Sequence, residues 1–590
     1  MKKLLIILLV LLGLFAVLGG GLLAIFGISR WAARDDVATG TVIEIDLEAA
    51  FNEYIPESPA AEVFAGGGAK VRDLVEALDR AAGDDRVAGI VARVGGSSSG
   101  MAITQEIRDA VLAFRDSGKF AVAFAETIGE GGPGNVGYYT ATAFEEIWLQ
   151  PSGDVSLTGL MSETPFISGA LKKLEITPRF DQRYEFKNMM NLFTETDMTA
   201  PHREAMTQLI DSHFGQILAG IAEARNMTVE EARAMFDHGP FLGQQAVEAG
   251  LVDGLRYRDE VRDDIRGRVD GTIEFLEWNK YLKRAGRPHK SGTGVALIYG
   301  VGNILRGPSG YNPVMGNMVL GSDTVSAALR DAIDDDSIKA IIFRVDCPGG
   351  SAVASESVRR EIVRAREAGK PVVVTMGNVA ASGGYWISLN ADRIIAQPGT
   401  ITASIGVLAG KFLTTPFWDN LGITFDDVQT SSFSTQYSSS YDYTEAGWAH
   451  FQEWLDRIYV EFTEKVAEGR DIPLEDVLKI ARGHIWTGED ALNLGLVDEL
   501  GGFPAALGAV RELLDLNAGA PLDLTLLPRE KTRFEKLAAM FETSSDTAAA
   551  SAAAIETMRA LQPAIRGVSQ VAVPPHQRGV VHAPALPEVE

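Results

Sequence analysis

The chain has 590 residues, of which 46% are hydrophobic and 23% charged, so it can bury a large core and form several domains. Its net charge of -25 would repel a phosphate backbone, which excludes nucleic acid as an expected partner. The single cysteine, Cys347, excludes an intramolecular disulfide and a cysteine-based metal cluster within one chain, and neither a metal nor a cofactor is predicted.

The N-terminus is predicted to be a membrane anchor. Lys2 and Lys3 precede an uncharged run over residues 4–28, which exceeds the roughly 20 residues that a helix needs to cross a bilayer. The run is longer than the apolar core of a signal peptide and lacks a small-x-small exit. We therefore expect residues 1–36 to form a cytoplasmic N-terminus and an uncleaved transmembrane helix. The two lysines favour an extracytoplasmic position for the rest of the chain, although Arg30 and Arg34 reduce the charge asymmetry.

Residues 40–502 alternate between strand and helix patterns, which predicts an α/β fold, and the pattern occurs twice. Residues 84–94 match residues 335–345 without a gap, and the sequence GLVD occurs at both 250–253 and 495–498. Tandem duplicated domains are therefore expected. The predicted parts are a first repeat over residues 37–281, a linker over 282–294, a second repeat over 295–515, and a partly disordered tail over 516–590.

In the second repeat, a buried strand leads into DCPGGS (residues 346–351). Adjacent glycines allow backbone amides to face a cleft and to stabilise an oxyanion, and the alternative is a tight strand-to-helix turn. The next strand leads to Ser382, which follows Ala381 and precedes Gly383 at the start of a predicted helix. Such a serine is either an uncrowded nucleophile near the positive end of the helix dipole or a helix cap. Asn135 stands at the matching position of the first repeat, where a cap would be retained without a nucleophile.

A serine nucleophile needs a base, and none of the eight histidines lies in a motif with a placed carboxylate. His484, within GHIWTG (residues 483–488), is interpreted as a core or surface histidine. A lysine can act instead if burial lowers its pKa from about 10.4 toward neutrality. Residues 180–187 align without a gap with residues 425–432, so Lys187 corresponds to Ser432. Because each repeat has only one member of the pair, we predict that Lys187 is the general base for Ser382.

Two other segments resemble nucleophile sites. GSSSG (residues 96–100) fits the G-x-S-x-G elbow, but the repeat aligns it with the oxyanion loop at 347–351. Cys347 lies on that same loop beside Pro348 and has no assigned histidine. Neither is predicted to be the nucleophile.

The motifs DCPGGS, AASGGYWIS (380–388), ITASIGV (401–407) and RYEFK (183–187), with DMT downstream (197–199), resemble the signal peptide peptidase A family in its long, two-repeat, membrane-anchored form. The resemblance implies domains related to the ClpP and crotonase superfamily, assembled into a ring or bowl that is a tetramer of the chain. It also implies Ser382 as nucleophile, Lys187 as general base, Ser404 as hydrogen-bond partner of the lysine amine, and the amides of Gly350 and Gly383 as the oxyanion hole.

The expected function is that of a serine endopeptidase anchored in the bacterial inner membrane, with its site on the periplasmic side. Cleaved signal peptides and other unstructured apolar peptides are the expected substrates, hydrolysed through an acyl-enzyme. Two alternatives share the fold: a catalytically inactive scaffold, and a crotonase-like acyl-CoA enzyme. The predicted topology disfavours the second, because CoA is a cytoplasmic cofactor.

Overall fold

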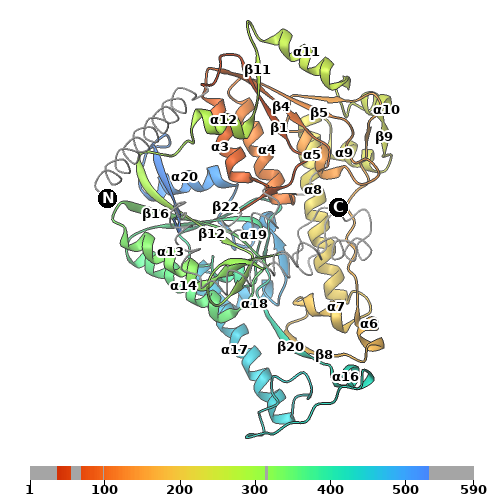
Figure 1. Ribbon diagram of the computed structural model, residues 1–590, viewed down its shortest axis with the longest axis vertical. Coiled ribbons are helices and arrows are strands. Elements are labelled where there is room, and N and C mark those ends of the chain that lie inside the picture. The colour runs from red at the N-terminus through yellow and green to blue at the C-terminus, as the bar shows by residue number, and fades with distance from the viewer. Residues whose placement is uncertain (1–35, 55–67, 97–98, 313–316, 530–590) are drawn as a thin grey trace, which may run out of the picture.

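The computed structural model describes residues 36–54, 68–96, 99–312 and 317–529 (Figure 1). The predicted anchor run at residues 4–28 and most of the predicted tail lie outside these residues. Among the helices that are described, none combines the length and the apolar character needed to cross a membrane.

A six-stranded parallel sheet forms the centre of the first repeat, in the order β10-β6-β5-β4-β1-β11. Its strands are β1 (Thr41–Asp46), β4 (Val87–Arg93), β5 (Phe120–Ala125), β6 (Glu146–Leu149), β10 (Gly254–Leu255) and β11 (Glu274–Glu277). The smaller strands of this repeat are β2 (Phe51–Asn52), β3 (Ala69–Lys70), β7 (Asp154–Val155), β8 (Thr177–Arg183) and β9 (Phe241–Leu242). Nearly continuous apolar runs such as VAGIVAR in β4 suit strands that are buried on both faces.

Helices cover both faces of this sheet. The helices of the first repeat are α3 (Val71–Ala82), α4 (Met101–Arg115), α5 (Asn135–Ala141), α6 (Ser168–Lys173), η1 (Asn188–Met190), α7 (Asn191–Thr194), α8 (Ala200–Arg225), α9 (Val229–Phe236), α10 (Gly243–Glu248), α11 (Arg258–Arg268) and α12 (Trp278–Ala285). Of these, α6 and α7 pack on β8, away from the sheet. The largest core lies between the sheet and α3, α4, α5 and α8. Helix α11 covers the opposite face, where Val261 and Ile265 pack against Val42 and Val91.

The second repeat has an eight-stranded sheet with the path β21-β19-β17-β16-β12-β23, to which β18 and β22 are joined through β17. Its strands are β12 (Thr293–Val301), β16 (Ile338–Cys347), β17 (Val372–Ala381), β18 (Arg393–Ala396), β19 (Ile401–Ala403), β21 (Ile485–Thr487), β22 (Glu499–Leu500) and β23 (Leu522–Leu527). Outside this sheet lie β13 (Asn303–Leu305), β14 (Gly310–Asn312), β15 (Asn317–Gly321) and β20 (Val407–Leu413). The helices are α13 (Ser322–Asp334), α14 (Ala352–Glu367), α15 (Gly383–Trp386), α16 (Thr415–Asn420), α17 (Glu445–Arg470), α18 (Leu474–Ile480), α19 (Gly488–Asn493) and α20 (Phe503–Leu513).

The same side-chain bonds occur at matching places in the two repeats. Lys119 Nζ donates to two backbone carbonyls at the end of α3, and Lys370 Nζ does the same at the end of α13, with all four distances between 2.7 and 2.8 Å. The hydroxyl of Tyr138 donates to the carbonyl of Leu251 (2.7 Å), and that of Tyr385 donates to the carbonyl of Leu496 (2.9 Å). These paired bonds support the predicted duplication, and the predicted α/β class is confirmed.

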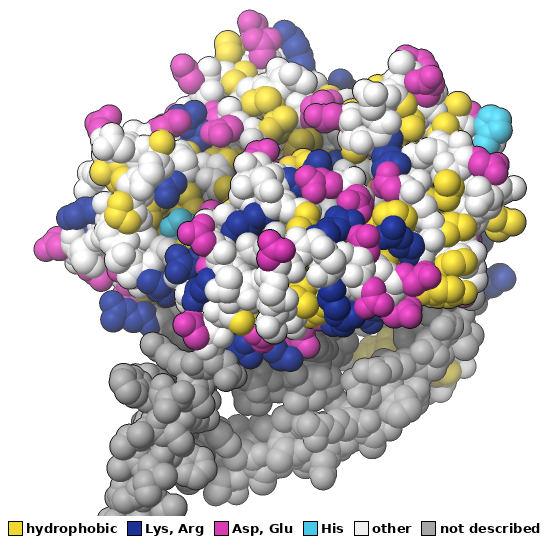
Figure 2. Space-filling model, turned by 90° about the horizontal axis from the view of Figure 1, so that it is seen from above, with side chains coloured by type: hydrophobic (Ala, Val, Ile, Leu, Met, Phe, Trp, Pro, Cys, Tyr) yellow, Lys and Arg dark blue, Asp and Glu magenta, His cyan; other side chains and the backbone are white. Residues whose placement is uncertain are grey.

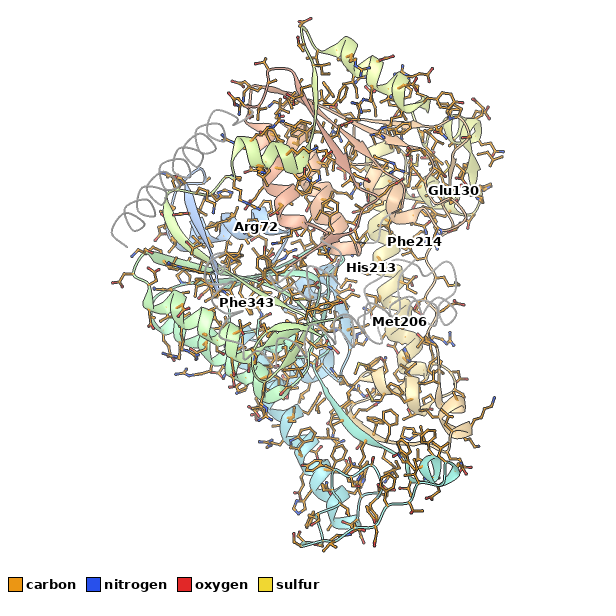
Figure 3. The ribbon with its side chains drawn as sticks, viewed as in Figure 1. Arg72, Glu130, Met206, His213, Phe214 and Phe343 are labelled. Atoms are coloured by element: carbon orange, nitrogen blue, oxygen red, sulfur yellow. The ribbon has the colours of Figure 1, made fainter. Side chains whose placement is uncertain are left out.

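The two repeats contact each other through several elements. In Figure 1 the first repeat lies above the second, and α8 extends down beside the second repeat. His213, labelled on α8 in Figure 3, has its Nε2 3.0 Å from the carbonyl oxygen of Gly399. Strand β8 pairs antiparallel with β20 over seven residue pairs, from Arg183 with Val407 to Thr177 with Leu413. Asn378 Oδ1, on β17, accepts from the amide of Ile103 (3.2 Å) in the first turn of α4.

A buried ion cluster also joins the repeats. Arg344, on β16, binds Glu53 (2.5 Å) and Glu106 (2.6 Å) of the first repeat, and all three side chains are almost fully buried. A second guanidinium nitrogen donates to Thr375 Oγ1 (2.9 Å). Burial raises the pKa of the Glu53 carboxyl. This cluster was not predicted from the sequence, although an arginine inside an otherwise apolar strand is a visible signal.

On the face seen in Figure 2, basic and acidic side chains are interspersed over the first repeat. The first repeat contains ion pairs between α11 and the sheet, such as Arg262 with Glu44 and Arg268 with Glu146, both 2.7 Å. Its charged side chains are therefore partly paired, and ion pairs close to the surface contribute little to stability.

Two predicted boundaries differ from the structure. Strand β23, at Leu522–Leu527, pairs in parallel with β12, so the predicted tail over 516–590 begins too early. Helix α12, at Trp278–Ala285, crosses the predicted start of the linker at residue 282 and packs on α3. The run LDLTLL has only six residues, and its pattern alone does not distinguish a strand of the sheet from a tail segment.

Candidate active site

Ser382 lies between the end of β17 and the start of α15. Its backbone has φ 53° and ψ -116°, a region that non-glycine residues rarely adopt and that the surrounding structure must enforce. Its amide donates to the carbonyl of Ala403 (2.7 Å), and its carbonyl accepts from the amide of Trp386 (2.9 Å). Its side chain makes no cap bond to α15, so the helix-cap alternative is wrong for this serine.

Lys187 follows β8 and reaches from the first repeat into the second. Its Nζ is 2.9 Å from Ser382 Oγ, 2.7 Å from the carbonyl oxygen of Ser404 and 3.0 Å from Ser404 Oγ. The side chain is 7% exposed. The structure therefore brings Lys187 together with Ser382 and Ser404, which lie 195 and 217 positions later in the chain.

Burial sets the protonation state of this lysine. Desolvation lowers the pKa of Lys187 to about 7, because an ammonium group loses its hydration in the interior. Among the described residues, no carboxylate lies close enough to Lys187 to offset this lowering of its pKa. A neutral amine is thus accessible near neutral pH, which is what a general base requires.

The loop after β16 presents Gly350 beside Ser382. Gly349 has φ 116° and Gly350 has φ 148°, and a Cβ added to Gly349 would lie only 2.8 Å from the Cβ of Ser382. Ile304, on β13, fixes the loop, because its amide donates to the carbonyl of Gly349 (2.8 Å) and its carbonyl accepts from Ser351 (2.9 Å).

The predicted oxyanion donors are both free within the described part of the chain. Gly349 and Ser351 each form a hydrogen bond with Ile304, and the amide of Gly350 between them donates no hydrogen bond to a described residue. The amide of Gly383 belongs to the first residue of α15, where no preceding helical carbonyl can accept from it. A Cβ built on Gly383 would be 3.2 Å from the Gly350 nitrogen, so the two segments lie against each other. Two unpaired amides next to Ser382 suit the stabilisation of an oxyanion.

The rejected alternatives have other roles. Cys347 is buried, its Sγ accepts from the amide of Gly349 (3.4 Å), and burial raises the pKa of the thiol to about 12, which makes it a poor nucleophile. His484 stacks on Trp486 and packs against Phe186, with ring centroids 4.0 and 4.5 Å apart. Its Nδ1 lies 2.7 Å from the carbonyl oxygen of Ile485, so this histidine packs as a buried ring.

The chain matches the family model described as Peptidase family S49 over residues 113–270 and 364–517, which together are more than half of its length. It is 32% identical to Protease 4 of Salmonella typhi over 458 residues, which cover 75% of this chain and 72% of that protein. The chain belongs to peptidase family S49. The resemblance to the signal peptide peptidase A family is confirmed, and the protein is a serine peptidase.

Other relatives agree with this assignment. The peptidase is 31% identical to Protease 4 of Haemophilus influenzae over 75% of this chain and 73% of that protein. It is 27% identical to a chloroplastic serine protease SPPA of Arabidopsis thaliana over 79% of this chain and 69% of that protein. A ClpP1 mutant structure from Listeria monocytogenes aligns with 36% of this chain and 94% of that chain, at 16% identity and a TM-score of 0.23. A TM-score this low does not show a shared fold. The relation to the ClpP and crotonase superfamily therefore stays a prediction.

The matching place in the first repeat of the peptidase is built differently. Asn135 is buried, its Oδ1 accepts from the amide of Thr158 (2.9 Å), and its Nδ2 donates to the carbonyl of Gly159 (2.8 Å). The Asn135 side chain therefore bonds to the loop after β7 and does not cap α5. The prediction that Asn135 is a helix cap is wrong. Positive φ angles at Ser382, Ala403 and Ser404 have no counterpart at the equivalent positions 135, 156 and 157. At these three matched positions, positive φ therefore occurs only in the repeat that contains the serine.

The GSSSG segment of the peptidase leads from β4 to α4, as the oxyanion loop leads from β16 to α14. Residues 97 and 98 lie outside the described residues, and Ser99 is buried, with its Oγ accepting from the amide of Phe51 (2.9 Å). This bond gives Ser99 a structural role.

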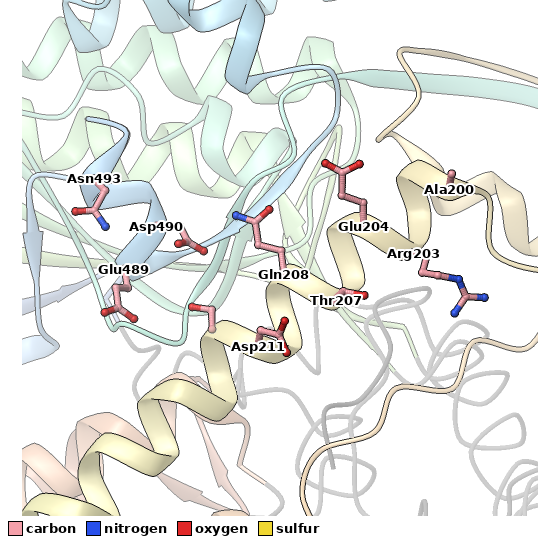
Figure 4. Close-up of a pocket in the computed structure, with 10 residues that line it drawn as sticks. Ala200, Arg203, Glu204, Thr207, Gln208, Asp211, Glu489, Asp490 and Asn493 are labelled. Atoms are coloured by element: carbon pink, nitrogen blue, oxygen red, sulfur yellow. The ribbon is translucent and has the colours of Figure 1, made fainter. Parts of the chain in front are cut away.

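A cavity of about 860 Å³ lies elsewhere in the peptidase, between α8 and α19. Figure 4 shows its lining, in which Glu204, Asp211, Glu489 and Asp490 supply four carboxylates. None of the five predicted site residues lines it. The candidate site is therefore assigned from the contacts around Ser382.

Proposed function

We propose that this peptidase is a membrane-anchored endopeptidase with a Ser382–Lys187 dyad on the extracytoplasmic side of a bacterial inner membrane. The single observation that supports the dyad best is the buried 2.9 Å contact between Lys187 Nζ and Ser382 Oγ, since no other basic side chain of the described residues bonds to that oxygen. The substrates are cleaved signal peptides and other unstructured apolar peptides. Membership of a peptidase family removes the scaffold and acyl-CoA alternatives.

In the proposed reaction, neutral Lys187 accepts the proton of Ser382 Oγ as the oxygen attacks the peptide carbonyl. The amides of Gly350 and Gly383 donate to the resulting oxyanion. The two N–H groups of the neutral lysine amine donate to the carbonyl oxygen and the Oγ of Ser404. The lone pair of Nζ then points toward Ser382 Oγ. The protonated lysine then donates to the leaving amine, and after a water enters, Lys187 activates it to release the acyl group.

Cleavage of an unstructured peptide by the purified full-length protein tests this proposal. Parent protein, Ser382→Ala and Lys187→Ala are compared, and Ser357→Ala serves as control, because Ser357 lies on the exposed side of α14. Each dyad variant should lose at least about 10³-fold in kcat/KM. Undiminished cleavage by either variant would contradict the dyad.

The membrane topology rests on the apolar run at residues 4–28 and on the charges that flank it. Protease added to intact spheroplasts should digest the domains, whereas a tag before Lys2 should be protected. Digestion only after lysis would place the domains in the cytoplasm and overturn the proposed location.

We propose that the chain also forms a closed homo-oligomer, a tetramer by family resemblance. Within one chain, β8 of the first repeat pairs with β20 of the second. Their counterparts, residues 422–428 and 160–166, form no helix and pair with no strand among the described residues. The first counterpart exposes Ile423, Phe425 and Val428 at 43%, 51% and 98%. Pairing residues 422–428 of one copy with residues 160–166 of the next would repeat the internal contact around a ring.

Light scattering after size-exclusion chromatography tests this assembly. Val428→Asp together with Phe425→Asp should dissociate the oligomer, whereas Val229→Asp, at an exposed helix start outside this surface, should leave the mass unchanged. A monomeric parent protein, or a double variant with the parent mass, would contradict the ring.

A further inference from the structure

The turn formed by Arg482, Gly483 and His484 lies between the two segments that hold Lys187 and Ser404. On one side, the Phe186 amide donates to the carbonyl of Arg482 (3.2 Å). On the other side, the Ser404 amide donates to the carbonyl of His484 (2.9 Å), and the Gly483 amide donates to the carbonyl of Ile405 (2.8 Å). One turn of the second repeat therefore binds the base from the first repeat and its hydrogen-bond partner at the same time.

Gly483 is in direct backbone contact with Lys187. It has φ +83°, and a Cβ added there would lie 2.4 Å from the backbone nitrogen of Lys187, 2.5 Å from its Cβ and 2.6 Å from its Cα. These atoms belong to the backbone and the root of the side chain, so they cannot rotate away. Any residue other than glycine at position 483 must push Lys187 away from its present place.

The turn that matches this one in the first repeat has another residue at the position of Gly483. The segments 238–250 and 483–495 align without a gap, from His238 with Gly483 to Gly250 with Gly495. The first repeat forms its β9–α10 unit with a histidine at this position, and His238 lacks the positive φ of Gly483, so the two turns differ in backbone conformation. The first repeat has its glycine one residue later, at Gly239. The turn with a glycine at positive φ therefore occurs in the repeat that contacts Lys187.

Side chains of the same turn also contact Glu185 and Phe186, the two residues that precede Lys187. Arg482 forms an ion pair with Glu185, two residues before the lysine. The His484 ring packs against Phe186, with centroids 4.5 Å apart, and is backed by Trp486 at 4.0 Å. The residues immediately before Lys187 are therefore fixed by charge and by ring packing.

We propose that residues 482–484 form a lysine seat, in which Gly483 is a positioning residue for the general base. The inference rests on the proposed Ser382–Lys187 dyad. The seat sets how far Lys187 Nζ reaches toward Ser382 Oγ and keeps the amine out of water, while Gly483 itself touches neither substrate nor the reacting atoms.

The test compares Gly483→Ala with Gly369→Ala in the full-length protein. Gly369 also has a positive φ, +76°, in the second repeat, but a Cβ there would meet nothing within 4 Å, so it reports the backbone cost alone. Gly483→Ala should lower kcat/KM by about 100-fold, as expected for an ångström-scale displacement of a catalytic group. A displaced lysine is better hydrated, so the midpoint of the pH dependence of kcat/KM should also move upward from about 7. Gly369→Ala should change neither quantity.

Phe186→Ala provides a second variant in case Gly483→Ala does not fold. It removes the ring that packs on His484 without a positive φ, and it should raise the same pH midpoint with a smaller loss of rate, about 10-fold. Parent-like kcat/KM and midpoint in a folded Gly483→Ala, or in Phe186→Ala if the first variant does not fold, would overturn the seat. An equal loss in Gly369→Ala would do so as well. If Lys187→Ala retains full activity, the dyad itself fails, and that result is separate from failure of the seat.

Discussion

At the scale of single residues, the proposed reactivity depends on a lysine whose amine can be neutral near pH 7. The pKa of Lys187 falls from 10.5 to about 7 because the amine is desolvated, and its polar neighbours are hydroxyl and carbonyl oxygens of uncharged residues. The serine contributes a second local property, an enforced backbone geometry.

This pKa predicts the pH dependence of the reaction. Because the active form of Lys187 is unprotonated, kcat/KM should rise with pH through a midpoint near 7 and level off above it. Initial rates on an unstructured peptide between pH 5 and 9 measure the midpoint. A profile that is flat over this range, or that falls with rising pH, would be inconsistent with the lysine base.

The same shift predicts a cost in stability. Since the folded pKa lies below the unfolded value, the unfolded state binds more protons between about pH 7 and 10.5, so stability rises with pH across that window. Lys187→Met removes the amine and should stabilise the protein at pH 7 by on the order of 2–4 kcal/mol. The gain should vanish by about pH 11. Thermal unfolding at both pH values measures it, and a destabilised variant at pH 7 would refute the stated cause.

At the scale of elements, the buried cluster of Arg344, Glu53 and Glu106 connects β16, which leads to the oxyanion loop, with the first repeat. Arg344→Ala would leave two carboxylates buried without their partner, so we expect a loss of about 3–5 kcal/mol in unfolding free energy. Arg266→Ala, which breaks an exposed pair with Asp263, should change it by less than about 1 kcal/mol. Denaturant titration compares them, and equal effects would contradict the role of the cluster.

The elements also show what a sequence can and cannot predict. The alternation of strands and helices followed from the hydrophobic pattern of residues 40–502. The pairing of Lys187 with Ser382 followed from the internal repeat, because equivalent residues that differ show which repeat contains which group. The strained angles at Ala403 and Ser404 and the contact of Gly483 with Lys187 depend on segments far apart in the chain. No local pattern encodes such contacts. Strand β23 was missed because an alternating run of only six residues does not by itself reveal that it pairs with β12.

At the scale of the whole molecule, the site exists only where the two repeats meet. Lys187 comes from the first repeat, and Ser382, Ser404 and both glycine amides come from the second. Residues 37–286 and 287–529, produced separately, should each fail to cleave peptide, because each contains only one member of the dyad. Peptide hydrolysis by either half alone would show that the division of the site between repeats is wrong.

The most direct test of the central claim is covalent labelling of the full-length protein with a fluorophosphonate, followed by peptide mass spectrometry. The account predicts one adduct on Ser382, formed at a rate that rises with pH through a midpoint near 7 and falls at least about 10²-fold in Lys187→Ala. An adduct on another residue, or labelling of Ser382 in Lys187→Ala at the parent rate, would contradict it.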